Sequence, residues 1–300
     1  MSVNGDVTEA REASGSAPVS IVIVTPSLNH GRFIGQTIDS VLNQDHQPTS
    51  YWVIDGGSLD DTVRVIKNTE HVLDGWVSEP DSGQSEAINK GWNKASGADL
   101  YAWINSDDYL LPGALKRIAD EYLLCKDNKK TVGVFSGSGY KVNIEGQRIK
   151  DVSVRNITQA CPRTAFQFLQ SSVFFSGEAL RECGWLRNDL HYSMDWELVL
   201  RLSKNYQVRY VDDYLSCQRI YPETKTSSGG WIRNKEIAYI GRLHNGVFDR
   251  NHMLYWLYSN LLRCVPGTQP IRRGIRYKIA RVLQGFFGKL LESRSHMIHW

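Results

Sequence analysis

Acidic residues follow several short apolar runs, an arrangement that can gather reactive side chains at one edge of a sheet. Asp55 ends one such run, Asp81 lies in a polar loop after a second, and Asn105-Ser106-Asp107-Asp108 follows a third. Adjacent carboxylates repel each other unless a cation lies between them or one of them caps a helix. Oxygen ligands without Cys or His nearby favour Mg²⁺ or Mn²⁺. Turn formation is the alternative, because Asn, Ser and Asp are the commonest turn residues.

Asp55 also suits nucleotide recognition. A carboxylate at the end of the second strand of an α/β sheet can accept a hydrogen bond from a nucleobase or a ribose hydroxyl. The glycine pattern of dinucleotide-binding proteins is absent, because Pro26-Ser27-Leu28-Asn29-His30-Gly31 follows the first expected strand. Asp55-Gly56-Gly57-Ser58 is equally consistent with a turn in which Ser58 caps the next helix.

Strand and helix patterns alternate along the first part of the chain. Strands are expected at residues 20–25, 51–54, 72–77 and 100–104, and helices at 33–42, 59–67, 85–94 and 113–124. This alternation predicts right-handed crossovers and an α/β fold with a mainly parallel sheet. Ligands of such sheets bind beyond the carboxyl ends of the strands, so the acids should share one crevice. The later part is less regular, with strands expected at 132–135, 173–175, 208–211 and 214–219 and a helix at 196–204.

The composition is typical of a folded protein. The chain has 300 residues, 41% apolar and 22% charged, which argues against fibrous and disordered classes. The apolar run at residues 253–262 is shorter than the roughly 20 residues of a membrane-spanning helix. Residues 1–18 lack the apolar block of a secretory signal and are expected to form a solvated tail. The five Cys residues form no Cys-x-x-Cys pair, which favours a reducing cytoplasm.

Positive charge is concentrated at the end of the chain. The net charge is +3, whereas residues 251–300 carry eight Lys or Arg residues and one acid. An amphipathic helix with its cations opposite the apolar face is predicted from the spacing of Ile271, Ile275, Ile279, Leu283 and Phe286. Such a helix can lie on an anionic membrane. Alternatively, its apolar face packs on the rest of the protein or on a second subunit, as in a homodimer.

Five motifs occur in a characteristic order. They are Thr25-Pro26-Ser27-x-Asn29, Asp55-Gly-Gly-Ser58-x-Asp60-x-Thr62, Ser78-Glu79-Pro80-Asp81-x-Gly83, Ala87-x-Asn89-Lys90-Gly91 and Trp103-x-Asn105-Ser106-Asp107-Asp108. Over about residues 19–226 the chain resembles the inverting family 2 glycosyltransferases of the GT-A fold, and it is most similar to the bacterial branch that builds O-antigen and exopolysaccharide.

The resemblance implies a Rossmann-like nucleotide-binding sheet fused to a smaller acceptor-binding mixed sheet. The implied division is residues 19–110 for the nucleotide-sugar, residues 111–245 for the acceptor and the catalytic base, and residues 246–300 for the basic C-terminal region. The implied donor is a nucleotide-sugar, with UDP favoured by family habit. The implied acceptor is a glycan or a lipid-linked saccharide, which would place the protein on the cytoplasmic face of the inner membrane.

Specific residues can be assigned by the same resemblance. The implied nucleotide-binding residues are Thr25, Pro26, Ser27, Asn29, Asp55 and Ser106, and the implied donor-sugar residues are Asp81, Ser82, Gly83, Asn89 and Asn105. Asp107 and Asp108 would hold Mn²⁺ or Mg²⁺. The implied acceptor or phosphate contacts are Gln170, Trp196, Glu197, Arg219 and Lys225.

Asp195 in Met194-Asp195-Trp196-Glu197 matches the general base of the family. An acceptor hydroxyl must lose its proton as it attacks the anomeric carbon, so a carboxylate must lie within its reach. A metal-stabilised nucleoside diphosphate needs no separate acid to leave. The alternative is that Asp195 caps the helix expected at residue 196. Trp196 is consistent with either a sugar-stacking platform or a core position.

The chain departs from the family pattern at two positions. Asn105 replaces the first carboxylate of the usual Asp-x-Asp metal motif, which would leave metal binding mainly to Asp107. Tyr221 stands where the family often has His, so a phosphate-binding role would pass to Arg219 or Lys225.

Two other functions compete with sugar transfer. A glycoside hydrolase would need a paired acid and base around the bond. A nucleic-acid-binding protein could use the basic end, but the sequence contains no recognisable nucleic-acid-binding motif, so no nucleic-acid partner is expected.

Overall fold

The computed structural model describes residues 17–154, 168–225 and 229–244. Predictions for residues 1–16 and for the basic region 246–300 lie outside the described residues. The strands are β1 Ile21–Ser27, β2 Ser50–Asp55, β3 Gly75–Ser78, β4 Leu100–Trp103, β5 Tyr109–Leu110, β6 Val132–Val142, β7 Arg148–Val152, β8 Val173–Ser176 and β9 Gln207–Arg219. The α-helices are α1 Ile34–Leu42, α2 Thr62–Thr69, α3 Gln84–Lys94, α4 Ala114–Asp127, α5 Gly177–Cys183, α6 Met194–Leu202 and α8 Gly230–Leu243.

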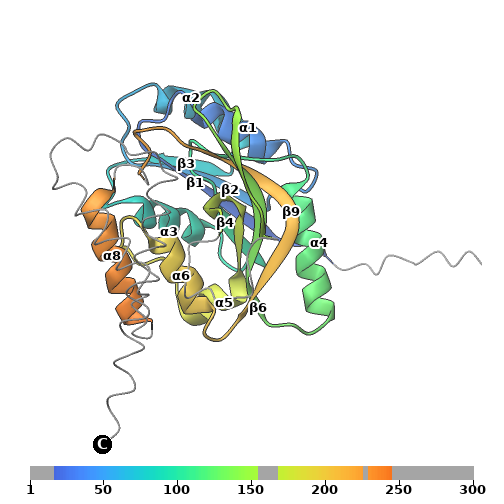
Figure 1. Ribbon diagram of the computed structural model, residues 1–300. Coiled ribbons are helices and arrows are strands. Elements are labelled where there is room, and N and C mark those ends of the chain that lie inside the picture. Colours follow the sequence, from blue (N-terminus) through green and yellow to red (C-terminus); the bar gives the residue numbers. More distant parts are fainter. Residues whose placement is uncertain (1–16, 155–167, 226–228, 245–300) are drawn as a thin grey trace, which may run out of the picture.

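The described strands form one sheet with the order β3-β2-β1-β4-β8-β6-β9-β5, and β7 pairs with β6 (Figure 1). β1 pairs in parallel with β2 and β4, and β2 pairs in parallel with β3. The predicted α/β class with a parallel first half is therefore confirmed.

The central strand β1 is apolar on both faces because helices cover both sides of the sheet. Val22 and Val24 belong to a core shared with Trp92 of α3, whereas Ile21 and Ile23 belong to the core on the α1 side. Gly91 lets α3 approach this strand, since a Cβ at that position would lie 2.6 Å from a methyl carbon of Val24. The close approach places the N-terminus of α3 at the carboxyl ends of the parallel strands.

The second half of the sheet is mixed. β8 runs antiparallel to β4 and β6, while the long strands β6 and β9 run parallel to each other and curve across the molecule (Figure 1). The two strands predicted at 208–211 and 214–219 are one strand. Asp212 and Asp213 form a bulge in β9, because Gly137 pairs with Val211 and the next residue pairs with Tyr214. An acidic pair that reads as a turn is thus accommodated within a continuous strand.

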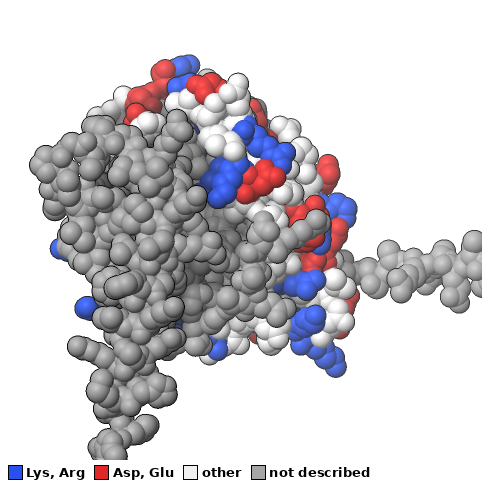
Figure 2. All heavy atoms as spheres, in the orientation of Figure 1, with Lys and Arg blue, Asp and Glu red and all other residues white. Residues whose placement is uncertain are grey.

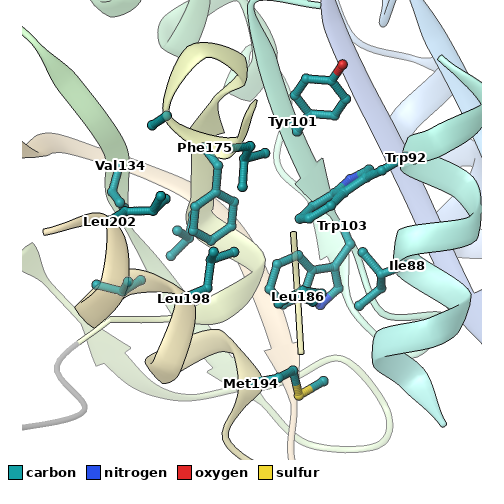
Figure 3. Close-up of a cluster of buried hydrophobic side chains, with 14 of the residues drawn as sticks. Ile88, Trp92, Tyr101, Trp103, Val134, Phe175, Leu186, Met194, Leu198 and Leu202 are labelled. Atoms are coloured by element: carbon teal, nitrogen blue, oxygen red, sulfur yellow. The ribbon is translucent and has the colours of Figure 1, made fainter. Parts of the chain in front are cut away.

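The core that contains Val22, Val24 and Trp92 also fixes the position of α6. Trp103 of β4 stacks on Phe175 of β8, with ring centroids 5.7 Å apart. Met194 and Leu198 of α6 face this aromatic pair (Figure 3). The first turn of α6 is therefore held against the end of β4.

The second helix begins later than its sequence pattern indicates. α2 starts at Thr62, and Ser58 is not its N-cap. The Ser58 hydroxyl donates to Asp55 instead, and Asp60 accepts a 3.0 Å hydrogen bond from the backbone N–H of Thr62. A bond to the strand end has replaced the expected helix cap.

Charged side chains of both signs are mixed over the described surface visible in Figure 2. Several form exposed ion pairs, including Arg64 with Asp61 and Lys116 with Asp120. Exposed pairs of this kind contribute little to stability because water screens them.

Candidate active site

A cavity of about 500 Å³ lies where the carboxyl ends of the parallel strands meet α6 and the end of β9. Its volume is within the range of about 300–1,000 Å³ that is usual for small-ligand sites. Predicted site residues from both halves of the chain line it, namely Pro26, Ser27, Asp81, Gly83, Asn105, Ser106, Asp107, Asp108, Gln170, Asp195, Arg219 and Lys225. Residues far apart in the sequence therefore converge on a single cavity.

Asp107 lies on the cavity wall with 9% of its surface exposed. Its Oδ2 accepts a 2.8 Å hydrogen bond from the Tyr221 hydroxyl. Burial and the negative charge of Asp107 raise the pKa of Tyr221, so this phenol remains a donor at neutral pH. The residue that replaces the family His therefore contacts the acidic motif directly.

Asp108 is almost fully buried beside Asp107. Its Oδ1 accepts a 2.9 Å hydrogen bond from the backbone N–H of Arg219, and its Oδ2 accepts a 3.3 Å bond from the Asn105 amide. Burial, followed by the charge of Asp107, raises the pKa of Asp108 well above its ordinary value. Asp108 is thus mainly a structural anchor of this loop, while Asp107 is the carboxylate better placed for a ligand.

The donor set matches one kind of metal site. Among the described residues no group of three or more His, Cys, Asp or Glu side chains could by itself enclose a metal ion. Mg²⁺ commonly binds one or two protein carboxylates together with substrate phosphates and water. Asp107 on the cavity wall, with Asn105 beside it, fits that shared type of site.

Asp195 is the second residue of α6 and faces the same cavity. Its Oδ1 accepts a 2.8 Å hydrogen bond from the backbone N–H of Trp196. Desolvation raises the pKa of Asp195 from 3.8 to about 6, although the positive charges of Arg233 and Lys225 oppose this shift. Asp195 does not occupy the N-cap, which is Ser193. A partly desolvated carboxylate of this pKa is suited to accept a proton near neutral pH.

A chain of polar side chains crosses the cavity. Lys225 Nζ donates to Gln84 Oε1 at 3.0 Å, and Gln84 Nε2 donates to Asn105 Oδ1 at 2.6 Å. The Asn105 amide in turn donates to Gln170 Oε1 at 3.2 Å. Desolvation of the ammonium lowers the pKa of Lys225. This series of hydrogen bonds joins the β9 side of the cavity to the start of α3.

Arg219 holds the acidic loop in place. Its guanidinium donates to the main-chain oxygen of Asp107 at 2.5 Å and to Gln36. The group also lies 4.9 Å from the ring centroid of Phe33 and 5.1 Å from that of Tyr109. With 5% exposure, Arg219 is largely occupied by protein contacts, whereas Lys225 offers the more accessible cation.

Asp55 does not line the cavity. It is fully buried at the end of β2, and one oxygen accepts from the backbone N–H groups of Gly57 and Ser58 and from the Ser78 hydroxyl. The other accepts from the Ser58 hydroxyl at 2.5 Å. The carboxylate predicted to contact a nucleobase therefore accepts hydrogen bonds from Gly57 and Ser58 of the turn after β2 and from Ser78 of β3.

Four other predicted ligand contacts also lie away from the cavity wall. Thr25 bonds to the Tyr51 hydroxyl at 2.9 Å, and Asn29 accepts from the backbone of Leu59. The remaining two have structural partners, Ser82 bonding to Glu86 and Asn89 to the Leu186 carbonyl. Each of these polar groups thus has a hydrogen-bond partner within the protein.

Trp196 and Glu197 point away from the cavity as well. Trp196 belongs to the hydrophobic core, so the platform interpretation is wrong and the core interpretation holds. Glu197 is 1% exposed and pairs with Arg201 at 3.0 Å and with His244 at 2.9 Å. On a helix only one face can line the cavity, and Asp195 occupies it.

Several residues that line the cavity were not predicted from the sequence, among them His30, Gln84 and Tyr192. His30 contacts the Ser106 hydroxyl at 2.7 Å, Gln84 connects Lys225 to Asn105, and Tyr192 precedes the α6 cap. Their positions could have indicated a place at the cavity, because His30 and Gln84 follow the ends of β1 and β3 in the chain. Neither side chain belongs to a recognised metal or nucleophile pattern, so residue type alone did not single them out.

No helix in the described part of the chain has both the length and the hydropathy to cross a membrane.

Comparison with known proteins identifies the family. Residues 22–177 match the family model described as glycosyl transferase family 2. An uncharacterized glycosyltransferase of Mycobacterium tuberculosis strain H37Rv is 38% identical over 94 residues, covering 31% of this chain and 35% of that protein. A chondroitin synthase of Pasteurella multocida is 26% identical over 194 residues, covering 61% of this chain and 19% of that protein. The matches thus span about a third or less of the length of these relatives.

Solved structures show the same fold at low sequence identity. TarS of S. aureus in complex with UDP-GlcNAc has a TM-score of 0.59 at 15% identity, covering 82% of this chain and 72% of that one. The mannosyltransferase PcManGT from Pyrobaculum calidifontis, in complex with GDP-Man and Mn²⁺, has a TM-score of 0.54 at 16% identity, covering 96% and 84%. The family match and the mixed sheet together confirm the predicted GT-A architecture. The chain belongs to glycosyl transferase family 2.

Proposed function

We propose that the protein is an inverting glycosyltransferase that moves a sugar from a nucleotide-sugar, with UDP as the favoured nucleotide, to a hydroxyl of a glycan or lipid-linked saccharide. The observation that carries the proposal is that Asp107 and Asp195 line one cavity of about 500 Å³. Membership of family 2 supports sugar transfer, and a complex of TarS with UDP-GlcNAc supports a uridine donor.

The donor is proposed to occupy the side of the cavity formed by the first half of the chain, about residues 19–110. Pro26 and Ser27 would contact the nucleotide, and Asp81 the donor sugar, because all three line the cavity at parallel strand ends. Asp107 would hold Mg²⁺ or Mn²⁺ together with the diphosphate, and the ion would neutralise charge on the leaving nucleoside diphosphate. The Lys225 ammonium belongs to the lining of the same cavity, where it can add a second positive charge.

Asp195 is proposed to act as the general base. Its carboxylate would accept the proton of the acceptor hydroxyl while that oxygen attacks the anomeric carbon from the face opposite the leaving group. With a pKa of about 6, the carboxylate is mostly ionised at neutral pH and still basic enough to take the proton. A single displacement of this kind inverts the anomeric configuration.

The acceptor is proposed to approach over residues 111–245, and the pathway is proposed to be surface polysaccharide synthesis of the O-antigen or exopolysaccharide kind. Residues 246–300 carry the excess of basic residues, which suits attachment to an anionic membrane at its cytoplasmic face. A second copy of the chain is the competing occupant for the apolar face of that segment.

The test is donor screening followed by product analysis. The full chain is incubated with a panel of UDP- and GDP-sugars and Mn²⁺, and nucleoside diphosphate release is measured with and without saccharide acceptors. Asp195→Asn should abolish transfer and leave donor affinity nearly unchanged. Product anomers, assigned by NMR, should be inverted relative to the donor. Normal turnover by the Asn variant, or retained configuration, would contradict the proposal.

A further inference from the structure

One carboxylate on α8 accepts hydrogen bonds from three consecutive backbone N–H groups in front of α6. Glu236 Oε1 accepts from His191 at 2.5 Å, and Oε2 accepts from Tyr192 and Ser193 at 2.6 Å each. Hydrogen bonds to an ionised acceptor are short and stronger than neutral ones. Three of them on one side chain fix the path of residues 191–193.

This carboxylate orders the residues that lead into α6 and does not bind the free N–H groups of its first turn. Ser193 is the N-cap of α6, yet its side chain makes no capping bond, and among the described residues its hydroxyl has no hydrogen-bond partner. The charge of Glu236 lies instead at the positive end of the α6 dipole. Asp195 is only two residues beyond the cap. The group that orders the start of the helix therefore also determines where the proposed base stands.

α8 is anchored firmly enough to serve as a support. Ile240 is fully buried in the same core as Met194, and His244 after the end of α8 pairs with Glu197 of α6 at 2.9 Å. Gly229, just before α8, packs against Tyr192 so closely that a Cβ there would lie 2.8 Å from the ring. Three separate contacts thus hold α8 against the segment that it supports.

We propose that Glu236 is a positioning residue for Asp195. It fixes residues 191–193 so that the Asp195 carboxylate keeps its place on the cavity wall. Glu236 does not itself line the cavity, although its charge acts on Lys225, which does. The inference rests on the proposed role of Asp195 as the base. It adds a determinant of catalysis on α8, beyond residues 22–177 that match the family model.

The first test measures the support directly and needs no substrate. E236Q keeps the size of the side chain but replaces one acceptor oxygen by an NH₂ group, which cannot accept these bonds. Amide hydrogen exchange of the full chain should then be about tenfold or more faster at residues 191–193, because lost hydrogen bonds favour local opening. Y239F is the matched control on the same helix. It removes only the 2.9 Å bond from Arg187 and should leave these amides unchanged.

The second test measures the consequence for the reaction. E236Q should lower kcat on the order of 100-fold, because a small displacement of a reacting group has an effect of that size. Donor affinity should stay within about twofold, and the acidic limb of the kcat profile should move to lower pH as Asp195 becomes better solvated. E236D, which keeps the charge on a shorter arm, should recover part of the rate. Y239F should resemble the wild type.

Each outcome supports or overturns the positioning role of Glu236. Unchanged amide exchange in E236Q, or faster exchange with a normal kcat and pH profile, would overturn the positioning role. If E236Q folds poorly, E236D is measured in its place. Its shorter side chain should support residues 191–193 only in part, so amide exchange and kcat equal to those of the wild type would overturn the positioning role. Failure of the proposed function has a different signature, since the wild type would then transfer no sugar or Asp195→Asn would remain active, whatever the exchange data show.

Discussion

Replacing the proposed base by its neutral isostere should make the protein inactive and more stable at once. Asp195→Asn keeps the shape of the side chain, and the Asn oxygen can still accept the 2.8 Å hydrogen bond from the Trp196 N–H. What disappears is a negative charge that the fold desolvates, as the raised pKa of Asp195 shows. The same desolvation that tunes the base thus opposes folding when the carboxylate is ionised.

The size of the effect follows from the pKa of Asp195. A shift from 3.8 to about 6 corresponds to roughly 3 kcal/mol at about 1.4 kcal/mol per pH unit. Water in the open cavity screens part of that penalty, so we expect Asp195→Asn to stabilise the protein by about 2 kcal/mol at pH 8. For a chain of this size, that is a rise in Tm of roughly 5 °C.

The sign of the pH dependence distinguishes this cause from others. Because the folded pKa of Asp195 lies above the unfolded one, the folded wild type takes up the proton first as the pH falls. The wild type therefore gains stability between pH about 6 and 4, and its deficit against the Asn variant shrinks over that window. Urea unfolding of both proteins at pH 8, 6 and 4.5 measures the gap. A variant less stable than the wild type at pH 8, or a gap independent of pH, would refute the desolvation argument.

Three further predictions concern the cation site, the sheet and a buried ion pair. Asp107→Ala should weaken Mn²⁺-dependent donor binding about tenfold or more in calorimetric titrations, and unchanged affinity would remove it from the metal site. Gly91→Ala should destabilise the fold by about 1–3 kcal/mol in urea unfolding, because its Cβ would lie 2.6 Å from a Val24 methyl. Arg201→Met leaves the 1% exposed Glu197 without its guanidinium partner and should cost about 3–5 kcal/mol; a loss below about 1 kcal/mol would show that His244 alone suffices.

The parallel half of the fold was predictable because its signals are local. An apolar run such as Ile21–Val24 followed by a helical repeat fits one arrangement of strand, loop and helix. The bulge at Asp212-Asp213 was not predictable, because its pairing depends on β6, some seventy residues earlier in the chain. α8 gave no usable pattern either, since Ile232, Tyr239 and Leu243 are exposed on it.

The candidate site was predictable to the extent that parallel strand ends converge. Asp81, Asp107 and Asp195 reach one cavity. Their positions after apolar runs indicated this for Asp81 and Asp107, whereas the family resemblance implied it for Asp195. Asp55 met the same sequence criterion but is satisfied by Ser58 and Ser78, and the sequence does not reveal which donors a loop turns inward. Glu236 lies on an element whose packing partner is distant in the chain, so neither spacing nor motif could connect it with Asp195.

The seam between β4 and β8 limits how this protein can be altered. Leu100 pairs with Ser176 and Tyr101 with Phe175, so the parallel strands of the first half and the mixed strands of the second half belong to one hydrogen-bonded sheet. Chimaeras that exchange everything after residue 110 must preserve this register, because otherwise the exchanged β8 will not pair with β4. Loops far from the seam carry no such restriction, so substitutions and insertions have the most freedom there.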